Sequence, residues 1–176
     1  MTTLWADLET FSTRDISNGA HQYAEDCSVL LFGYAIDDDP AQVWDLTTGE
    51  AMPDDLRAAL NNPSVNTVWH NGANFDSTVL RRAKNLHVDL PFERVDDCMV
   101  KAYSHGLPGA LGTLSEVFGL PVDTAKDKDG RRLVLKFCKP DSKGNVRSRR
   151  TDPEDWARFV NYCRLDVEAM RVVYKK

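Results

Sequence analysis

Leu4-Trp5-Ala6-Asp7-Leu8-Glu9 is a short, mostly apolar run close to the start of the chain. Its length and composition predict a buried β-strand over residues 4–9. Side chains two positions apart in a strand point to the same face of the sheet. We therefore expect Asp7 and Glu9 to lie side by side.

Two more acidic motifs follow along the chain. Asp76 ends the stretch His-Asn-Gly-Ala-Asn-Phe-Asp (70–76), and Asp166 ends Tyr-Cys-Arg-Leu-Asp (162–166). Tyr162 and Asp166 are four apart in a segment with helical periodicity, so they share one helix face. Four clustered carboxylates would repel one another without cations. Oxygen ligands of this kind suit Mg²⁺ or Mn²⁺, and two such ions are a recurring device for phosphodiester cleavage.

Each motif is weak evidence by itself. The chain has a second Asp-x-Glu at 152–154 and a second Tyr-x-x-x-Asp at 34–38. A single carboxylate of this kind is commonly solvated surface charge or a helix cap. The ordered set is more informative, because each member falls where a particular strand or helix is expected.

The order Asp-x-Glu, Asn-x-x-x-Phe-Asp and Tyr-x-x-x-Asp resembles the DEDD exonucleases of the tyrosine subtype. That family includes ribonuclease D and the 3′→5′ proofreading domains of family A and family B DNA polymerases. The resemblance runs from Asp7 to the C-terminus. Four further stretches resemble the exonuclease region of bacteriophage family A polymerases: residues 107–111, 126–133, 137–140 and 162–168.

The resemblance implies a catalytic role for each member of the set. Asp7 would bridge two ions, and Glu9 and Asp166 would complete the tighter metal site. Asp76 would hold the second ion, often through water. Tyr162 would orient the attacking water, since an unperturbed pKa near ~10 makes its hydroxyl a poor base at neutral pH.

Residues that flank the first two motifs are candidates to contact the substrate. Thr10 and Phe11 directly follow the first motif, and the side-chain amide of Asn71 can donate to phosphate. Four residues separate Asn71 from Asp76, whereas many relatives have three. The remaining polar residues near the motifs have no metal-ligand spacing and are expected to be structural or are unassigned: His70, His105, Asp96 and Asp97.

Composition predicts one globular domain spanning residues 1–176. The chain is 42% hydrophobic, which is enough for a real core. The N-terminus lacks the basic region of a signal peptide, and the longest apolar run is too short to span a bilayer. The four cysteines have no Cys-x-x-Cys spacing, so zinc is not expected. We expect a monomer in the cytoplasm, that of a bacterial host if the gene belongs to a phage.

Charge is distributed unevenly along the chain. Residues 1–125 carry 7 Lys/Arg and 19 Asp/Glu, whereas residues 126–150 carry 10 Lys/Arg and 3 Asp/Glu. A basic segment on an acidic body is typical of contact with a phosphate backbone. The alternative is a solvated loop, which the composition of residues 141–145 favours.

The order of predicted elements indicates the fold class. Strands are expected at 4–9, 28–36, 42–46, 66–70 and 95–99, and helices at 53–60, 74–86, 99–104, 110–118 and from a Thr151 capping box onward. This order predicts an α/β protein with a mixed five-stranded sheet and helices on both faces. Combined with the motifs, it implies the ribonuclease-H-like fold, with a three-stranded meander and strand one beside strand four.

These patterns predict a two-metal 3′→5′ exonuclease that releases 5′-mononucleotides from single-stranded DNA, with proofreading as its role. The resemblance implies a polymerase domain as a partner. Two alternatives remain open. One is an exoribonuclease of the same superfamily, because choosing between sugars needs contacts to the 2′-hydroxyl. The other is a catalytically silent module that only binds nucleic acid.

Overall fold

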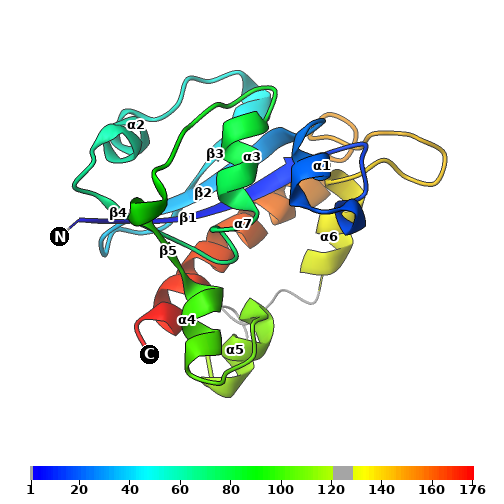
Figure 1. Ribbon diagram of the computed structural model, residues 1–176. Coiled ribbons are helices and arrows are strands. Elements are labelled where there is room, and N and C mark those ends of the chain that lie inside the picture. The colour runs from blue at the N-terminus through cyan, green and yellow to red at the C-terminus, as the bar shows by residue number, and fades with distance from the viewer. Residues whose placement is uncertain (1, 121–128) are drawn as a thin grey trace.

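The computed structural model describes residues 2–120 and 129–176, which surround a five-stranded sheet (Figure 1). The strands are β1 (Thr3–Phe11), β2 (Ser28–Ile36), β3 (Gln42–Asp45), β4 (Asn66–Trp69) and β5 (Val95–Asp97). Their order in the sheet is β3-β2-β1-β4-β5. The first three strands form an antiparallel meander, while β4 and β5 run parallel to β1. The predicted α/β class, the mixed sheet and the place of strand one beside strand four are confirmed.

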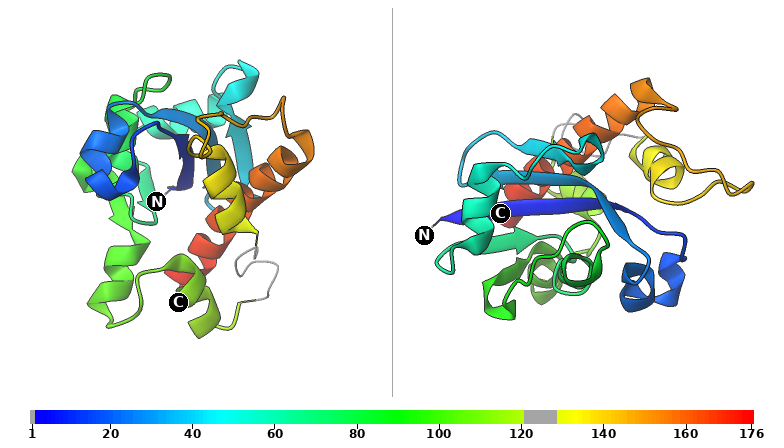
Figure 2. Two further views of the ribbon diagram at one scale, coloured as in Figure 1. Left: turned by 90° about the vertical axis from the view of Figure 1, so that its right-hand side faces the viewer. Right: turned by 90° about the horizontal axis from the view of Figure 1, so that it is seen from above.

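Helices cover both faces of the sheet (Figures 1 and 2). They are α1 (Ala20–Ala24), α2 (Asp54–Asn61), α3 (Asp76–Arg82), α4 (Cys98–Ser104), α5 (Leu111–Val117), α6 (Gly130–Phe137) and α7 (Pro153–Tyr174), with 3-10 turns at Ile16–Asn18, Leu46–Thr48 and Phe92–Arg94. Helices α1, α2 and α3 pack on one face, and α4 to α7 on the other. Among the described residues, no helix has the length and apolar character needed to cross a membrane.

Alternation along β1 decides which face carries which chemistry. Leu4 and Leu8 point into the core beneath α1, α2 and α3. Trp5, two residues before Asp7, packs with α7 on the opposite face. Because side chains alternate along a strand, Asp7 and Glu9 point to the α7 side as well.

Gly33 lets α7 lie close to the sheet. It is paired with Asp7 across the β1–β2 ladder. A Cβ atom at this position would lie 2.9 Å from Cys163 Sγ and 3.0 Å from Val167 Cγ2, both on α7. Any larger residue would therefore push α7 away from the strand that carries Asp7 and Glu9.

Two predicted helix boundaries were wrong, and one helix was not predicted. The helix expected at 74–86 is only α3, because the Asn85 side chain bonds the backbone N–H and C=O of Val29, each at 2.8 Å, and holds the chain outside the helix. The last helix has no Thr151 capping box; Asp152 is its N-cap and makes no side-chain cap hydrogen bond. Part of the basic segment is the helix α6, whose Leu133 and Phe137 are buried.

Candidate active site

The carboxylate cluster consists of Asp7, Glu9 and Asp166. One carboxylate oxygen from each of these residues lies within 4.8 Å of the others. Asp7 and Glu9 come from β1, and Asp166 comes from the middle of α7. The two chain regions predicted to share a site are therefore in contact.

Burial and neighbouring negative charges disfavour the ionised form of the carboxylates in this cluster. The pKa of Asp7 is raised well above its usual range, first by burial and then by the charges of Glu9 and Asp166. The pKa of Glu9 is raised well above its usual range for the same two reasons, burial first and Asp166 second. A divalent cation would offset this repulsion, and carboxylate oxygens are the ligands that Mg²⁺ and Mn²⁺ prefer. The donor set fits such an ion.

Asp76 lies at the edge of the carboxylate cluster. It is the first residue of α3 and only 3% exposed. Burial raises its pKa to about 8, with a further contribution from the charge of Asp97. Its own charge in turn raises the pKa of both Asp7 and Glu9, so the fourth carboxylate acts on the same site.

The Tyr162 side chain borders the cluster from α7. Its hydroxyl is hydrogen bonded to Asp166, one helical turn later. Burial, followed by the charge of Asp166, raises the pKa of Tyr162, so the hydroxyl keeps its proton at neutral pH. The ring packs on Gly130 of α6, where any Cβ atom would overlap it. Gly130 thus fixes the position of Tyr162, which the sequence did not indicate.

A family model for the RNase H superfamily matches residues 20–176. The chain belongs to the RNase H superfamily. It is 37% identical, over 182 residues, to a DNA polymerase of Bacillus phage SP02. That alignment covers 98% of this chain and 27% of the polymerase, so the chain spans about a quarter of its relative's length.

The fold of this RNase H superfamily member is similar to that of a solved structure, Brucella melitensis NrnC with bound Mg²⁺. The TM-score is 0.57, the sequence identity is 16%, and the match covers 98% of this chain and 71% of that one. At this identity the likeness concerns the fold alone. The predicted resemblance is confirmed for the superfamily and for a phage DNA polymerase, whereas the tyrosine subtype stays a prediction.

A cleft of about 300 Å³ opens beside the carboxylate cluster in this RNase H superfamily fold. Asp7, Tyr162 and Asp166 form one part of its lining, and His70 and residues of α5 form another. Burial lowers the pKa of His70, against a backbone hydrogen bond with Gly109, so the ring is neutral at pH 7. His70 had been expected to be structural or was unassigned. Its position directly before Asn71 in the second motif was the available signal.

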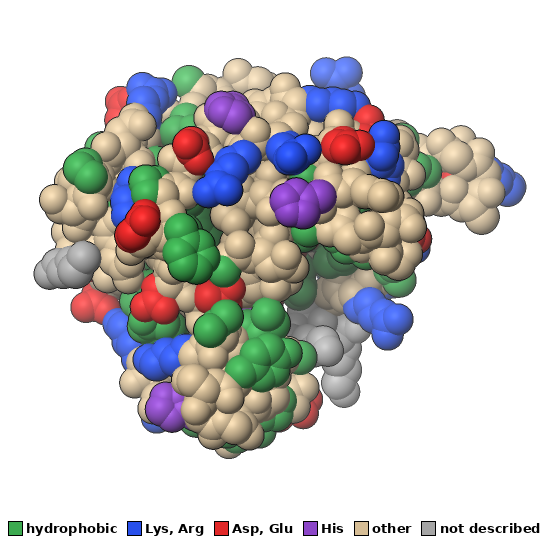
Figure 3. All heavy atoms as spheres, in the orientation of Figure 1, with side chains coloured by type: hydrophobic (Ala, Val, Ile, Leu, Met, Phe, Trp, Pro, Cys, Tyr) green, Lys and Arg blue, Asp and Glu red, His purple; other side chains and the backbone are tan. Residues whose placement is uncertain are grey.

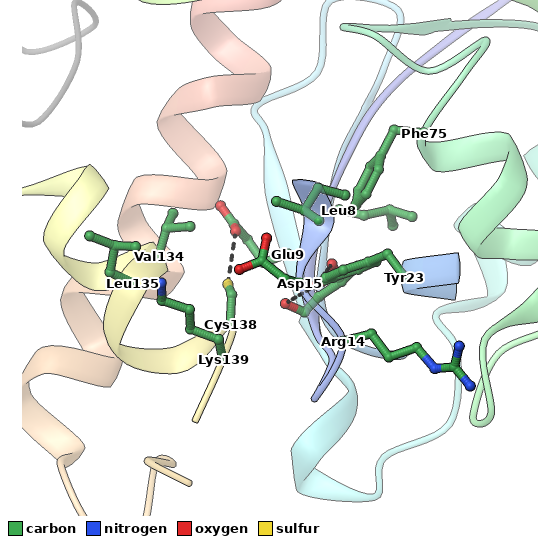
Figure 4. A pocket seen from close by; sticks show the side chains of 12 residues that line it. Leu8, Glu9, Arg14, Asp15, Tyr23, Phe75, Val134, Leu135, Cys138 and Lys139 are labelled. Atoms are coloured by element: carbon green, nitrogen blue, oxygen red, sulfur yellow. Dashed lines mark hydrogen bonds between the residues drawn. The ribbon is translucent and has the colours of Figure 1, made fainter. Parts of the chain in front are cut away.

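A second cavity, of about 280 Å³, lies on the other side of Glu9 (Figure 4). Its apolar lining includes Tyr23 and Phe75, while Cys138 and Lys139 approach from the end of α6. The Cys138 thiol donates to Glu9 Oε2 across 3.7 Å. The segment that follows α6 therefore forms one wall of the cavity on this side of the site.

The three predicted substrate contacts differ in their surroundings. Thr10 lines the second cavity, but its hydroxyl is already 2.8 Å from the Tyr23 hydroxyl. Phe11 is half-buried at the end of β1, opposite Ser28. Asn71 is half-buried in the turn before α3, where its backbone adopts a left-handed conformation with φ of 66°. Their roles toward substrate stay predictions.

Much of the basic segment, residues 126–150, is neutralised by its own protein. Residues 126–128 lie outside the described chain. Lys136 contacts Asp152 and Asp155, each at 2.6 Å, and Arg132 contacts Asp155 at 2.9 Å. Arg147 lies 3.6 Å from Asp141. These cations hold segments of the chain together.

Five described cations of the same segment form no ion pair with any residue that the structure describes: Arg131, Lys139, Lys143, Arg149 and Arg150. Three of them, Lys143, Arg149 and Arg150, lie close together in the sequence. They belong to the stretch between α6 and α7, which projects from the body as an arm with a basic side chain at its end (Figures 1 and 3). The described residues left for the predicted contact with phosphate are therefore these three, together with Arg131 of α6 and Lys139 beside the second cavity.

Proposed function

We propose that this chain is a two-metal-dependent 3′→5′ exonuclease that hydrolyses the terminal phosphodiester of single-stranded DNA. The observation that carries the proposal is the convergence of Asp7, Glu9 and Asp166, with their ligand oxygens within 4.8 Å of one another. The identity of 37% to a phage DNA polymerase across nearly the whole chain supports DNA as the substrate.

The residues of the site divide the work between holding ions and placing water. Asp7, Glu9 and Asp166 would hold one Mg²⁺ or Mn²⁺, and Asp7 with Asp76 would hold a second. Bound divalent ions lower the pKa of a coordinated water and stabilise charge on the attacking and leaving oxygens. Tyr162, kept protonated by burial and by Asp166, donates or accepts one hydrogen bond that orients the attacking water.

The two cavities beside the cluster supply the surface for the end of a strand. The cavity lined by Glu9, Thr10 and Phe75 has the apolar walls that a terminal base would contact. The cleft lined by Asp7 and Tyr162 would receive the scissile phosphate. Phe11 and Asn71 remain proposed contacts at the borders of these spaces.

We further propose that residues 1–176 act as one exonuclease domain, monomeric, in the cytoplasm of a bacterial host. A polymerase domain is the proposed partner, because the relative is a DNA polymerase of which the chain matches 27%. Proofreading is the role that such a pairing would serve.

The test uses 5′-labelled DNA and RNA strands of one sequence, each with Mg²⁺, with Mn²⁺ and with excess EDTA. We expect stepwise shortening of the DNA from its 3′ end, release of 5′-mononucleotides, and no reaction in EDTA. A circular single strand serves as the control and should stay intact. Faster shortening of RNA would replace the DNA assignment with an exoribonuclease, and binding without hydrolysis would point to a silent module.

A further inference from the structure

Asp97 is a buried carboxylate whose two oxygens are both occupied by backbone N–H groups. It is the last residue of β5 and is 6% exposed. Its Oδ1 accepts from Asn71 N at 3.1 Å, and its Oδ2 accepts from Ala73 N at 3.0 Å. Oδ1 also accepts from Met99 and Val100, at the start of α4. One side chain thus joins the turn before α3 to the start of α4.

The turn that Asp97 holds leads directly to Asp76. Parallel pairing of Trp69 with Asp97 brings the end of β4 beside the end of β5. The chain then turns through Asn71, whose φ of 66° is unusual for a residue other than glycine. Asn71 O accepts from Phe75 N at 2.9 Å, which closes the turn one residue before Asp76.

We infer that Asp97 is a positioning residue for the nuclease site: by binding the N–H groups of Asn71 and Ala73, it fixes the turn that presents Asp76 to the carboxylate cluster. The inference rests on the proposed function, since Asp76 matters only if the cluster holds ions. Buried carboxylates that accept several backbone N–H bonds hold a loop in one geometry, because each unpaired group would cost free energy.

The neighbouring residue provides a matched control. Asp96 precedes Asp97 in β5, so its side chain points the opposite way. Asp96 Oδ2 accepts from the Tyr174 hydroxyl at the end of α7. This contact does not involve the turn before α3. Replacing Asp96 therefore disturbs the same short strand while leaving the N–H groups of Asn71 and Ala73 bound.

The experiment compares Asp97→Ala, Asp97→Asn and Asp96→Asn by three measurements. Mn²⁺ affinity is measured by calorimetry, and amide hydrogen exchange is measured at Asn71 and Ala73. The kcat and KM values are measured on single-stranded DNA, at a temperature below the melting temperature of every protein variant. Loss of an outer-sphere support typically costs roughly 10–100-fold in metal affinity or activity. We expect a loss of this size for Asp97→Ala in kcat and in Mn²⁺ affinity, faster exchange at both amides, and KM within about threefold.

The conservative variant should fall between wild type and Asp97→Ala. Asn at this position keeps one acceptor oxygen but turns an N–H group toward a backbone donor. Asp96→Asn should leave kcat, Mn²⁺ affinity and both amides unchanged. The inference is overturned if Asp97→Asn and Asp97→Ala keep wild-type exchange and Mn²⁺ affinity, or if Asp96→Asn reproduces their losses. Absence of hydrolysis in the wild type would instead reject the proposed function, since exchange and Mn²⁺ binding do not depend on turnover.

Discussion

Two charged regions of this molecule meet α7 about three turns apart, at Asp166 and at Asp155, and are built differently. In the carboxylate cluster, half-buried Asp7 and buried Glu9 lie beside a third carboxylate, and like charge adds to burial in raising their pKa values. Between α6 and α7, in contrast, Arg132 and Lys136 meet Asp155 at 2.9 and 2.6 Å in partly exposed ion pairs. An aspartate is thus destabilising in the carboxylate cluster, as at Asp7, and paired with cations between α6 and α7, as at Asp155.

The ion pairs between α6 and α7 stabilise the folded state, whereas the repelling carboxylates of the cluster destabilise it and are kept together by the rest of the fold. A solvent-exposed ion pair contributes about 0–1 kcal/mol and needs no ligand. Buried like charges cost stability until a cation binds, and the bound cation then stabilises the folded state. We therefore expect substitutions in the carboxylate cluster to change activity, and substitutions in the ion pairs between α6 and α7 to change stability.

The largest expected effect comes from neutralising the cluster. Asp7→Asn keeps the side-chain volume but removes the charge of a proposed ligand, so hydrolysis should fall by about 10³-fold or more, because charge stabilisation by metal is worth several kcal/mol. The same variant should melt at a higher temperature than wild type when metal is absent, since one of the mutually repelling charges is gone.

Asp39→Asn is the control for this substitution, because Asp39 is exposed and its side chain makes no hydrogen bond or ion pair with the residues that the structure describes. It should change neither the rate nor the melting temperature of the metal-free protein. Retention of wild-type hydrolysis by Asp7→Asn would remove Asp7 from the site. A lower melting temperature would show that the cluster is not under repulsion.

The second largest effect is expected at Tyr162. Tyr162→Phe removes one hydrogen bond, which is worth roughly 1–3 kcal/mol, or about one to two orders of magnitude in rate. Gly130→Ala should reduce the rate as well, because the new methyl group overlaps the Tyr162 ring. Mn²⁺ affinity, measured by calorimetry, should fall by about tenfold at most in both variants, since Tyr162 supports the proposed ligand Asp166 without being a ligand itself. Loss of metal binding in Tyr162→Phe would mean that this residue is a ligand rather than an orienting group.

The pH dependence of stability offers a third test. The pKa of Asp76 is about 8 in the folded protein against an ordinary value of 3.8, so the folded state binds more protons than the unfolded state between these values. The contribution of Asp76 to the stability of the metal-free protein should therefore be full below about pH 4 and be lost as pH rises toward about 8. Thermal melting in EDTA across this range measures the slope.

Asp76→Asn provides the comparison for that slope, because it cannot ionise. Its melting temperature should fall less over the same pH range than that of wild type. Saturating Mg²⁺ should reverse the trend in wild type, since metal displaces protons more easily at higher pH. Identical slopes for Asp76→Asn and wild type would mean that Asp76 ionises normally in the folded state.

The smallest effect is expected on the basic side. Replacing Lys143, Arg149 and Arg150 together with Gln should raise KM severalfold and reduce the salt slope for single-stranded DNA by about 2, since each phosphate contact contributes about 0.7. Lys136→Gln should lower the melting temperature and leave the salt slope unchanged. An unchanged slope in the triple variant would show that the arm does not contact phosphate.

The carboxylate cluster was predictable because it follows from local geometry. A period of two places Asp7 beside Glu9, and a spacing of four places Tyr162 beside Asp166. Strand β4 pairs parallel with β1, so the turn that follows β4 and carries Asp76 lies at the same end of the sheet as the end of β1. These rules need only the type and order of elements, which the hydrophobic pattern indicates well.

Other features depend on contacts between distant segments and left little trace in the sequence. Gly33 matters because α7 crosses it, and Gly130 because Tyr162 packs on it. The end of α3 is set by the bonds of Asn85 to Val29. Helix α6 was hidden by its basic composition, although Leu133 and Phe137 have the spacing of a buried helix face.

The carboxylate cluster joins the first strand of the chain to its last helix, and this has a consequence for folding kinetics. Asp7 and Glu9 meet Asp166 only once α7 has docked on β1 across Gly33. An ion that needs all three ligands cannot bind a partly folded chain in which α7 is still free. Divalent cations should therefore slow unfolding while leaving the folding rate nearly unchanged, the behaviour of an interaction absent from the transition state. In the cell, such an ion would bind only after folding is complete and would then lengthen the lifetime of the folded state.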